Sequence, residues 1–246
     1  MDRDRTAIVT GAGKRVGRFI AEALLADSWA VVGHVHHGED SVPHGAIKAV
    51  SDLANPDCAN LIFAAAAGLP PVRLLVNNAA RFSSDAFGDF STEEFDSHMA
   101  VNVRAPALLS EAFAGRHGGG EGLIVNLLDA KLAAPNPDYL SYTLSKQALA
   151  GLTELAARAY AACGIRVNAI APALMLRSAG QSEANFAAMH KLNPLQRGVG
   201  PEDVVAALRY LIAAPTVTGQ ILTIDGGQRF LALDRDVQFL DNGDVA

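Results

Sequence analysis

The sequence predicts an α/β fold in which one doubly wound parallel sheet of about seven strands is flanked by helices. Short runs rich in Val, Ile and Leu alternate with longer helical stretches along the chain. The runs 74–76 and 123–125 are continuously apolar, as is typical of parallel strands buried on both faces. At 246 residues, half of them apolar, the chain can bury one core, so we expect a single domain spanning residues 1–246.

Each element follows from its local pattern. The predicted strands are residues 6–10, 30–34, 46–50, 73–77, 122–127, 165–170 and 220–224. The predicted helices are residues 15–27, 55–68, 91–115, 139–163 and 201–213. A capping box, Ser91-Thr92-Glu93-Glu94, starts the helix 91–115. The segment 34–45 contains two glycines and a proline, so the helix expected between the second and third strands is short or missing.

Composition excludes several classes of protein. The formal charge is −6 and the basic residues are scattered, which argues against a nucleic-acid partner. The chain starts with a charged segment that leads directly into the first strand, and no apolar run reaches membrane-spanning length, so we expect a cytoplasmic protein without a membrane partner. Cys58 and Cys163 both fall in predicted helices, which favours core packing over a disulfide framework or a metal site.

The first strand is followed at once by a glycine-rich turn. The letters are Gly11-Ala12-Gly13-Lys14-Arg15-Val16-Gly17, and a helical stretch follows. A strand, a glycine turn and a helix in this order bring backbone N–H groups and a helix N-terminus close to a phosphate. An ordinary tight turn is the alternative, but the context favours a dinucleotide site.

Tyr142 and Lys146 are four residues apart in an apolar, alanine-rich stretch, and this spacing places them on one helix face. A neighbouring ammonium favours the phenolate form of a tyrosine, so we expect Lys146 to lower the pKa of Tyr142 and make it a proton donor near neutral pH. Such a pair also arises by chance on solvated helices, and the glycine turn elsewhere in the chain is what favours a catalytic role for this one.

The end of the second strand bears on the choice of cofactor. A carboxylate there would hold the ribose hydroxyl of NAD, whereas basic groups favour the 2′-phosphate of NADP. No carboxylate occupies the strand end, and the basic residues near it are Lys14, Arg15, His34, His36 and His37. We therefore expect NADP(H) rather than NAD(H), although a solvated turn would explain any single histidine equally well.

Together these motifs resemble the short-chain dehydrogenase/reductase family. The pattern at residues 10–17 is T-G-x-G-x-x-x-G, and it is joined by Asn77-Asn78-Ala79-Ala80 and by the Tyr142/Lys146 pair. Most members of that family place a serine thirteen residues before the tyrosine, where this chain has Asp129. With His34-Val35-His36 and Arg81-Phe82, this aspartate resembles the pteridine reductase and dihydromonapterin reductase subgroup. The resemblance covers nearly the whole chain and implies a Rossmann-type fold.

The resemblance also implies roles for individual residues. Tyr142, Lys146, Asp129 and Asn102 would be catalytic, with Asn102 loosening its helix and holding a water linked to the lysine. The cofactor residues would be Gly11, Lys14, Arg15, Val16, Gly17, His34, His36, His37, Asp52, Leu53, Asn78, Ala79, Ala80, Tyr142, Lys146 and Pro172. The substrate would meet Phe82, Asp129, Tyr142 and Arg15, and no metal is expected. Ala80 lacks the hydroxyl usual in pteridine reductases, and Ala173 replaces the usual glycine after Pro172.

The expected function is an NADPH-dependent oxidoreductase that transfers a hydride to a pterin-like or related unsaturated heterocycle, with tyrosine as the proton donor. A general carbonyl reductase on the same scaffold and a non-catalytic nucleotide-sensing module are the alternatives. Residues 174–195 would form a substrate lid. The family suggests a homotetramer or dimer built on helices 91–115 and 139–163, and the apolar segment after Gly227 could dock on a neighbour or on its own subunit.

Overall fold

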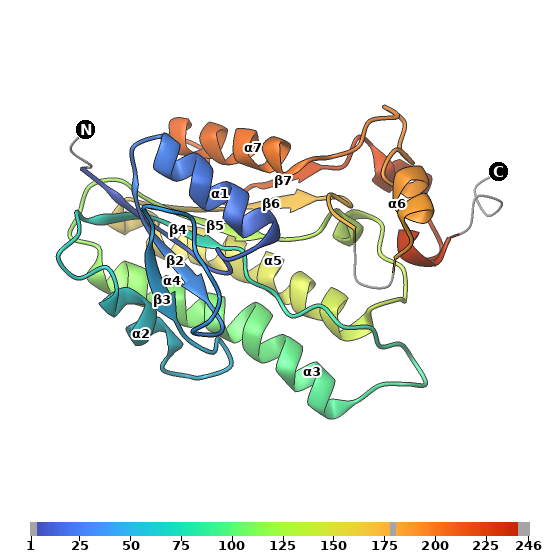
Figure 1. The fold of residues 1–246 in the computed structure, drawn as a ribbon, viewed down its shortest axis with the longest axis horizontal. Helices are drawn as coiled ribbons and strands as arrows, with labels where there is room; N and C mark the ends of the chain where they lie inside the picture. Colours follow the sequence, from blue (N-terminus) through green and yellow to red (C-terminus); the bar gives the residue numbers. More distant parts are fainter. Residues whose placement is uncertain (1–3, 178–180, 241–246) are drawn as a thin grey trace.

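A seven-stranded parallel sheet forms the centre of the computed structural model, which describes residues 4–177 and 181–240 (Figure 1). The strand order is β3-β2-β1-β4-β5-β6-β7. The strands are β1 (Thr6–Val9), β2 (Ala30–Val35), β3 (Ile47–Val50), β4 (Val72–Asn77), β5 (Gly122–Leu127), β6 (Ile165–Pro172) and β7 (Ile221–Ile224). The predicted doubly wound α/β class and all seven predicted strands are confirmed, with ends that shift by one or two residues.

Helices cover both faces of the sheet. They are α1 (Arg15–Ala26), α2 (Cys58–Ala64), α3 (Thr92–Met99), α4 (Ala105–Arg116), α5 (Leu140–Tyr160), α6 (Glu183–Met189) and α7 (Pro201–Ala213). Helices α1 and α7 pack together on one face, whereas α2, α4 and α5 lie on the other (Figure 1). The central strands β1, β2 and β5 are therefore buried along their whole length, whereas the edge strands β3 and β7 remain partly exposed.

The core is two apolar layers, one on each face of the sheet. Along β1, Ala7 and Val9 point into the layer under α1 and α7, while Ile8 points into the layer under α2 and α4. The register places Ile8 beside Leu75, and Leu75 beside Ile124, so the second layer is continuous across three strands. This packing explains why the strand sequences are uninterrupted apolar runs.

Two connections differ from a regular alternation. No helix lies between β2 and β3 in the described chain, which confirms the prediction for segment 34–45. The predicted helix 91–115 is wrong as one continuous helix, because a π-helical turn, Ala100–Arg104, separates α3 from α4. Half of the predicted capping box of α3 is confirmed, since the hydroxyl of Ser91 accepts the N–H of Glu94 at 3.3 Å. The Glu94 side chain accepts hydrogen bonds from Arg81 and Ser83 instead of closing the box.

The two cysteines have different environments. Cys58 is buried at the start of α2, as predicted. Cys163 is exposed, so the prediction of core packing is wrong for it: this residue ends a 3₁₀ turn, Ala161–Cys163, that continues beyond the buried face of α5. Across residues 4–177 and 181–240, none of the helices has the length and apolar character needed to span a membrane.

Candidate active site

The carboxyl ends of β1 and β4 are tied together by the Thr10 hydroxyl. Its oxygen accepts the N–H groups of Asn78 at 2.9 Å and Ala79 at 3.0 Å. The side-chain amide of Asn78 returns a 2.8 Å hydrogen bond to the carbonyl of Thr10. Ala79 is partly buried, while Ala80 is exposed beyond it. The predicted Asn-Asn-Ala-Ala segment therefore fixes the base of the glycine turn.

The glycine turn is closely packed and depends on its glycines. Gly11 has a φ of +68°, in the left-handed region that favours glycine. A Cβ on Gly17 would lie 2.2 Å from the carbonyl oxygen of Gly11, so only glycine fits there. No side chain caps the N-terminus of α1 at Lys14, which leaves the first N–H groups of the helix available to an anion.

Basic side chains surround this helix terminus. Lys14 and Arg15 are both exposed, and Val16 anchors the turn by packing against the core under α1 and α7. Arg15 has a φ of +51° and donates hydrogen bonds to the carbonyls of Leu176 at 3.2 Å and Arg177 at 3.0 Å. One arginine thus connects the glycine turn to the segment predicted as a substrate lid. Residues 178–180 of that segment lie outside the described residues.

The three histidines at the end of β2 are not equivalent. His34 is buried, its Nδ1 accepts the N–H of Gly11 at 3.2 Å, and its Nε2 lies 2.9 Å from the carbonyl of Ser51. Burial lowers the pKa of His34. With both ring nitrogens engaged and its charge disfavoured, His34 shapes the glycine turn rather than supplying positive charge to a phosphate, which corrects the expectation from sequence.

His36 and His37 are exposed and lie beside each other. Their ring centroids are 4.0 Å apart, and the Nε2 of His36 lies 3.8 Å from a carboxylate oxygen of Asp52. Asp52 is exposed at the end of β3 and accepts the N–H of Ala54 at 2.8 Å, while Leu53 is buried. These two histidines can therefore still reach a ligand at the strand ends.

Tyr142, Lys146 and Asp129 meet at the carboxyl end of β5. The phenol of Tyr142 donates a 2.9 Å hydrogen bond to Asp129, and the Nζ of Lys146 lies 5.7 Å from the Tyr142 ring centroid. Lys146 donates to the carbonyl of Leu127 at 2.6 Å. Tyr142 and Lys146 come from the first two turns of α5, so the predicted four-residue spacing does place them on one face.

Burial dominates the electrostatics of this group. It lowers the pKa of Lys146 to about 8 and raises the pKa of Asp129. The pKa of Tyr142 is raised well above its usual value, first by burial and then by the charge of Asp129. The expectation that Lys146 lowers the pKa of Tyr142 is therefore wrong for this structure, because burial of the hydroxyl and its hydrogen bond to Asp129 both favour the protonated form. Tyr142 stays protonated and able to donate.

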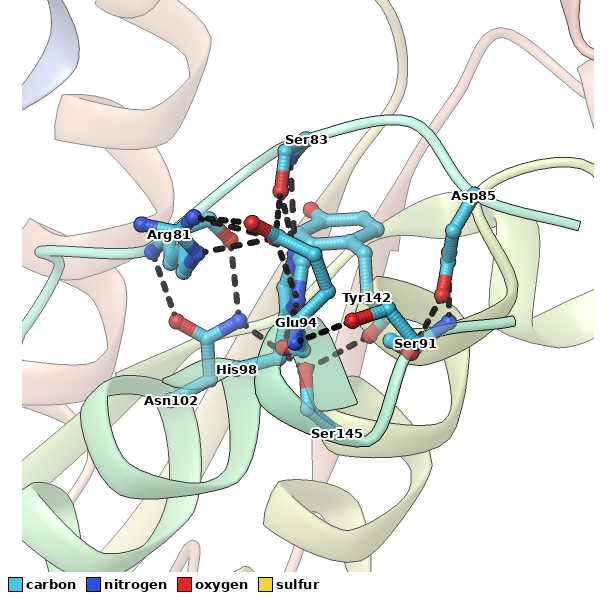
Figure 2. A network of polar contacts seen from close by, with 10 residues as sticks. Arg81, Ser83, Asp85, Ser91, Glu94, His98, Asn102, Tyr142 and Ser145 are labelled. Atoms are coloured by element: carbon cyan, nitrogen blue, oxygen red, sulfur yellow. Dashed lines mark hydrogen bonds and ion pairs between the residues drawn. The ribbon is translucent and has the colours of Figure 1, made fainter. Parts of the chain in front are cut away.

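Asn102 is buried within the π-helical turn, which excludes the surface alternative. Its side-chain oxygen accepts the N–H of Arg81 at 2.7 Å, and its Nδ2 donates to the Arg81 carbonyl at 3.0 Å and to the Ser145 hydroxyl at 2.9 Å (Figure 2). Asn102 therefore joins three parts of the site: the π-helical turn, the loop that follows β4, and the residue before Lys146.

A polar network that the sequence did not reveal holds the loop after β4. Arg81 forms a two-pronged ion pair with Glu94 of α3, with a shortest contact of 2.7 Å (Figure 2). The Ser83 hydroxyl donates to the same carboxylate at 2.7 Å, and the buried His98 ring lies against both. The hydrogen bonds from Arg81 and Ser83 stabilise the ionised carboxylate and hold the pKa of Glu94 below its usual value.

Asp85 is a second residue that sequence reasoning missed. Its carboxylate accepts the N–H of Ser141 at 2.9 Å and also the Ser141 hydroxyl, while its carbonyl accepts the N–H of Leu140 at 3.1 Å. A carboxylate near the N-terminus of a helix satisfies free N–H groups and complements the helix dipole. Asp85 therefore anchors the end of α5 that carries Tyr142. Its distance of more than fifty residues in sequence hid this relationship.

Aromatic rings form one wall of a pocket at this end of the sheet. Phe82 stacks on Tyr139 at 4.4 Å between ring centroids and meets Tyr142 edge-on at 4.7 Å. Tyr139 stacks in turn on Phe239 at 5.6 Å. Phe82 remains about half exposed, at 46%. The pocket has a volume of about 130 Å³ and is also lined by Asp129 and Tyr142.

The C-terminal segment, residues 228–240, also contributes to the lining of this pocket. Asp138, just before α5, pairs with Arg235 at 2.8 Å and accepts the N–H of Asp236 at 2.8 Å. The Tyr139 hydroxyl donates to Gln238 at 2.6 Å. Residues 235–239 therefore pack on their own subunit, whereas Phe230 remains 72% exposed. Pro172, the last residue of β6, is buried nearby at the same sheet edge.

With this geometry established, comparison with known proteins identifies the class. A family model described as enoyl-(acyl carrier protein) reductase matches residues 11–229. A short-chain type dehydrogenase/reductase from Picea abies is 32% identical, covering 91% of this chain and 92% of the relative. The chain belongs to the short-chain dehydrogenase/reductase family of oxidoreductases.

Within the family, the relatives include the subgroup that the sequence resembles. Pteridine reductase 1 from Leishmania tarentolae is 30% identical, covering 90% of this chain and 95% of the relative. L-xylulose reductase from Bos taurus is 33% identical, covering 93% and 97%.

Among solved structures, the FolM alternative dihydrofolate reductase 1 from Brucella canis, complexed with NADP, superimposes with a TM-score of 0.88 at 33% identity and covers 92% of this chain and 94% of that one. Its counterpart from Brucella suis, also with NADP, has a TM-score of 0.86 at 31% identity and covers 100% of both chains. The resemblance to pteridine reductases predicted from sequence is confirmed.

Proposed function

We propose that this enzyme is an NADPH-dependent reductase of pterin-like or related unsaturated nitrogen heterocycles. The observation that carries the proposal is the Asp129 carboxylate, which accepts the Tyr142 hydroxyl at 2.9 Å inside the pocket. A carboxylate in this position can accept N–H groups of an amino-heterocycle, which a plain ketone does not possess. Relatives named pteridine reductase and alternative dihydrofolate reductase support the same substrate class.

The residues present fit NADP. The N-terminus of α1 is uncapped, and Gly11 and Gly17 leave room for close approach of a pyrophosphate. Lys14, Arg15 and the exposed pair His36 and His37 would hold the 2′-phosphate. Asp52, Leu53, Asn78, Ala79, Ala80 and Pro172 would line the rest of the cofactor site. The bound cofactor would supply the hydride, and the NADP complexes of the similar structures support this preference.

The side chains then divide the remaining chemistry among them. Tyr142 donates its hydroxyl proton to the substrate nitrogen or oxygen, since its raised pKa keeps it protonated at neutral pH. Lys146, held by the Leu127 carbonyl, places an ammonium beside the phenolate that remains. Asp129 orients the substrate and supports proton delivery. Asn102 fixes the π-helical turn against Ser145 and so positions the lysine, and it would hold a relay water.

Phe82 would offer an aromatic face to the substrate, with Tyr139 supporting it from behind. Arg15, which reaches the backbone at Leu176 and Arg177, would close over substrate and cofactor together. Residues 174–195, which include α6, would serve as the lid.

A general carbonyl reductase is the second candidate, and the similarity to L-xylulose reductase favours it. The two candidates share Tyr142, Lys146 and Asn102 and differ in the use of Asp129. A non-catalytic nucleotide-sensing module is the third. The complete set of Asn102, Asp129, Tyr142 and Lys146, in which Tyr142 donates to Asp129, argues against it.

The deciding experiment follows NADPH oxidation with dihydrobiopterin, dihydromonapterin and a panel of ketones and sugars. We expect turnover with at least one dihydropterin and a higher kcat/KM than with any ketone. Activity confined to ketones would establish the second candidate instead. Tight NADPH binding with no turnover on any compound would favour the sensing module.

We further propose a cytoplasmic homo-oligomer, a dimer or tetramer that uses α4 and α5. Leu144 and Leu155 on α5 are 40% and 70% exposed, and Gly151 between them permits close approach of a second helix. Light scattering with the variant Leu155→Glu tests this assembly. We expect a smaller particle than the wild type, and an unchanged mass would argue against α5 as the contact.

A further inference from the structure

The pocket is lined by a second carboxylate besides Asp129, that of Asp236 on the C-terminal segment. Its side chain is 18% exposed, and one oxygen accepts the N–H of Gln238 at 3.1 Å. The other oxygen has only a long contact, 3.4 Å, to the Nζ of Lys131. Asp236 therefore retains acceptor capacity that faces the pocket.

The other charged groups near these two carboxylates already have partners. Arg229 is paired with Asp225 at 2.8 Å and Arg235 with Asp138 at 2.8 Å. Lys131 donates to the Asp138 carbonyl as well as to Asp236, and the Lys146 ammonium lies beside Tyr142, which donates to Asp129. Asp236 is therefore able to accept a hydrogen bond from a ligand group that donates N–H.

Contacts next to the catalytic helix hold Asp236 in place. Its backbone N–H donates to the Asp138 carboxylate at 2.8 Å, and Asp138 immediately precedes Tyr139, the N-cap of α5. Phe239 stacks on the Tyr139 ring. The segment that carries Asp236 is therefore attached to the end of α5 that carries Tyr142, and both residues line the same pocket.

We propose that Asp236 is a specificity-determining residue that accepts the amino group of a 2-amino-substituted heterocycle, while Asp129 and Tyr142 engage the part of the ring that is reduced. The inference rests on the proposed reductase function, because it states that the C-terminal segment recognises the amino group of the substrate. A hydrogen bond to a charged acceptor is worth about tenfold in affinity or more. The amino group of the substrate should contribute this factor through Asp236.

Calorimetric titration of the NADP⁺-loaded protein with pterin and with lumazine tests this assignment without relying on turnover. The two ligands share one fused ring system, and lumazine has an oxo group where pterin has the amino group. In mildly acidic buffer we expect the wild type to bind pterin about tenfold more tightly. The variant Asp236→Asn, which can still accept the Gln238 N–H, should reduce this preference to about twofold or less.

Two variants complete the design. Asp234→Asn removes an exposed carboxylate on the same segment and should keep the wild-type preference. Asp236→Glu retains the negative charge and should keep most of the wild-type preference for pterin over lumazine. A wild type without preference, or a preference that survives Asp236→Asn, would overturn the assignment.

The reductase function and this inference can fail separately. Preferential binding of pterin without NADPH oxidation would refute the reductase function and support recognition of the amino group by Asp236. Turnover of dihydropterins with equal kinetics in wild type and Asp236→Asn would support the reductase function and refute the role of Asp236. If neither ring binds the wild type, both fail.

Discussion

The hydroxyl of Tyr142 donates to Asp129 at 2.9 Å, and both residues line the pocket. Burial raises the pKa of both groups, and the charge of Asp129 raises that of Tyr142 further. In this arrangement Tyr142 is protonated and donates its hydroxyl proton in a hydrogen bond to Asp129. A substrate atom bound next to the hydroxyl would compete with Asp129 for that proton.

Replacing the phenol tests its role directly. We expect Tyr142→Phe to lower kcat on the order of a hundredfold or more, because a positioned general acid contributes about this factor. NADPH affinity should stay close to wild type, as measured by fluorescence titration. Tyr160→Phe, which removes a hydroxyl bound to Glu111 at 3.0 Å on the opposite end of α5, is the matched control. Near-normal turnover in Tyr142→Phe would remove the assignment.

Asp129→Ser should separate pterins from ketones. The serine restores what most family members carry at this position, so activity on a small ketone should persist. The kcat/KM for a dihydropterin should fall at least about tenfold, since a charged acceptor is lost. Steady-state kinetics with both substrates measures the ratio. An equal loss on both substrates would mean that the carboxylate serves the fold or Tyr142 alone.

Lys146 should cost the protein stability at neutral pH. Its pKa is lowered to about 8, chiefly by burial, from an unfolded value near 10.5. Below pH 8 the lysine is protonated in both states, so the full cost of burying the charge is present. Between about 8 and 10.5 the unfolded chain binds more protons than the folded one, and stability contributed at this site rises with pH.

The variant Lys146→Met should therefore be inactive but more stable than wild type at pH 7, by on the order of 3 kcal/mol or less, because the hydrogen bond to Leu127 is also lost. The gain should shrink as the pH rises above 8. Urea unfolding over this range measures it, with the exposed Lys191→Met as control. A variant less stable than wild type at every pH would contradict the burial cost.

His34 predicts a loss of stability in acid. Burial lowers its pKa below 6.5, so between the two values the unfolded chain binds more protons. Stability should fall as the pH drops through about 6.5 and level off once the folded form is also protonated. NADPH affinity should weaken together with it, because protonation breaks the acceptor bond to Gly11.

The variant His34→Asn removes the titrating ring, and thermal unfolding as a function of pH is the measurement. Its Tm should change less than that of the wild type between pH 7 and acid. The exposed His44→Asn should behave as wild type. Identical pH curves for wild type and His34→Asn would place the acid sensitivity elsewhere.

The fold and the central pair of the site could be predicted because they depend on local patterns. Apolar runs define strands, and the four-residue spacing of Tyr142 and Lys146 defines a shared helix face. The Arg81–Glu94 clasp and the Asp85 anchor could not be predicted, because each joins a loop to a helix that the sequence alone does not place beside it.

The roles of His34 and Cys163 show the same limit for single residues. From sequence, a histidine at a strand end is predicted to bind a ligand, but in the structure both ring nitrogens of His34 are engaged by Gly11 and Ser51. From sequence, Cys163 is predicted to lie in the core because it falls in a predicted helix, but the α-helix ends before it. Whether one side chain is buried depends on its tertiary contacts, and the residues next to it in the sequence do not determine them.

Residues 228–240 line the pocket although none of the seven strands and none of the helices α1 to α7 lies in this segment. A protein shortened before Arg235 would keep its sheet, its glycine turn and the Tyr142–Asp129 contact, yet lose the ion pair with Asp138 and the carboxylate at 236. A fusion that displaced this segment would therefore alter substrate selection while the protein still folded.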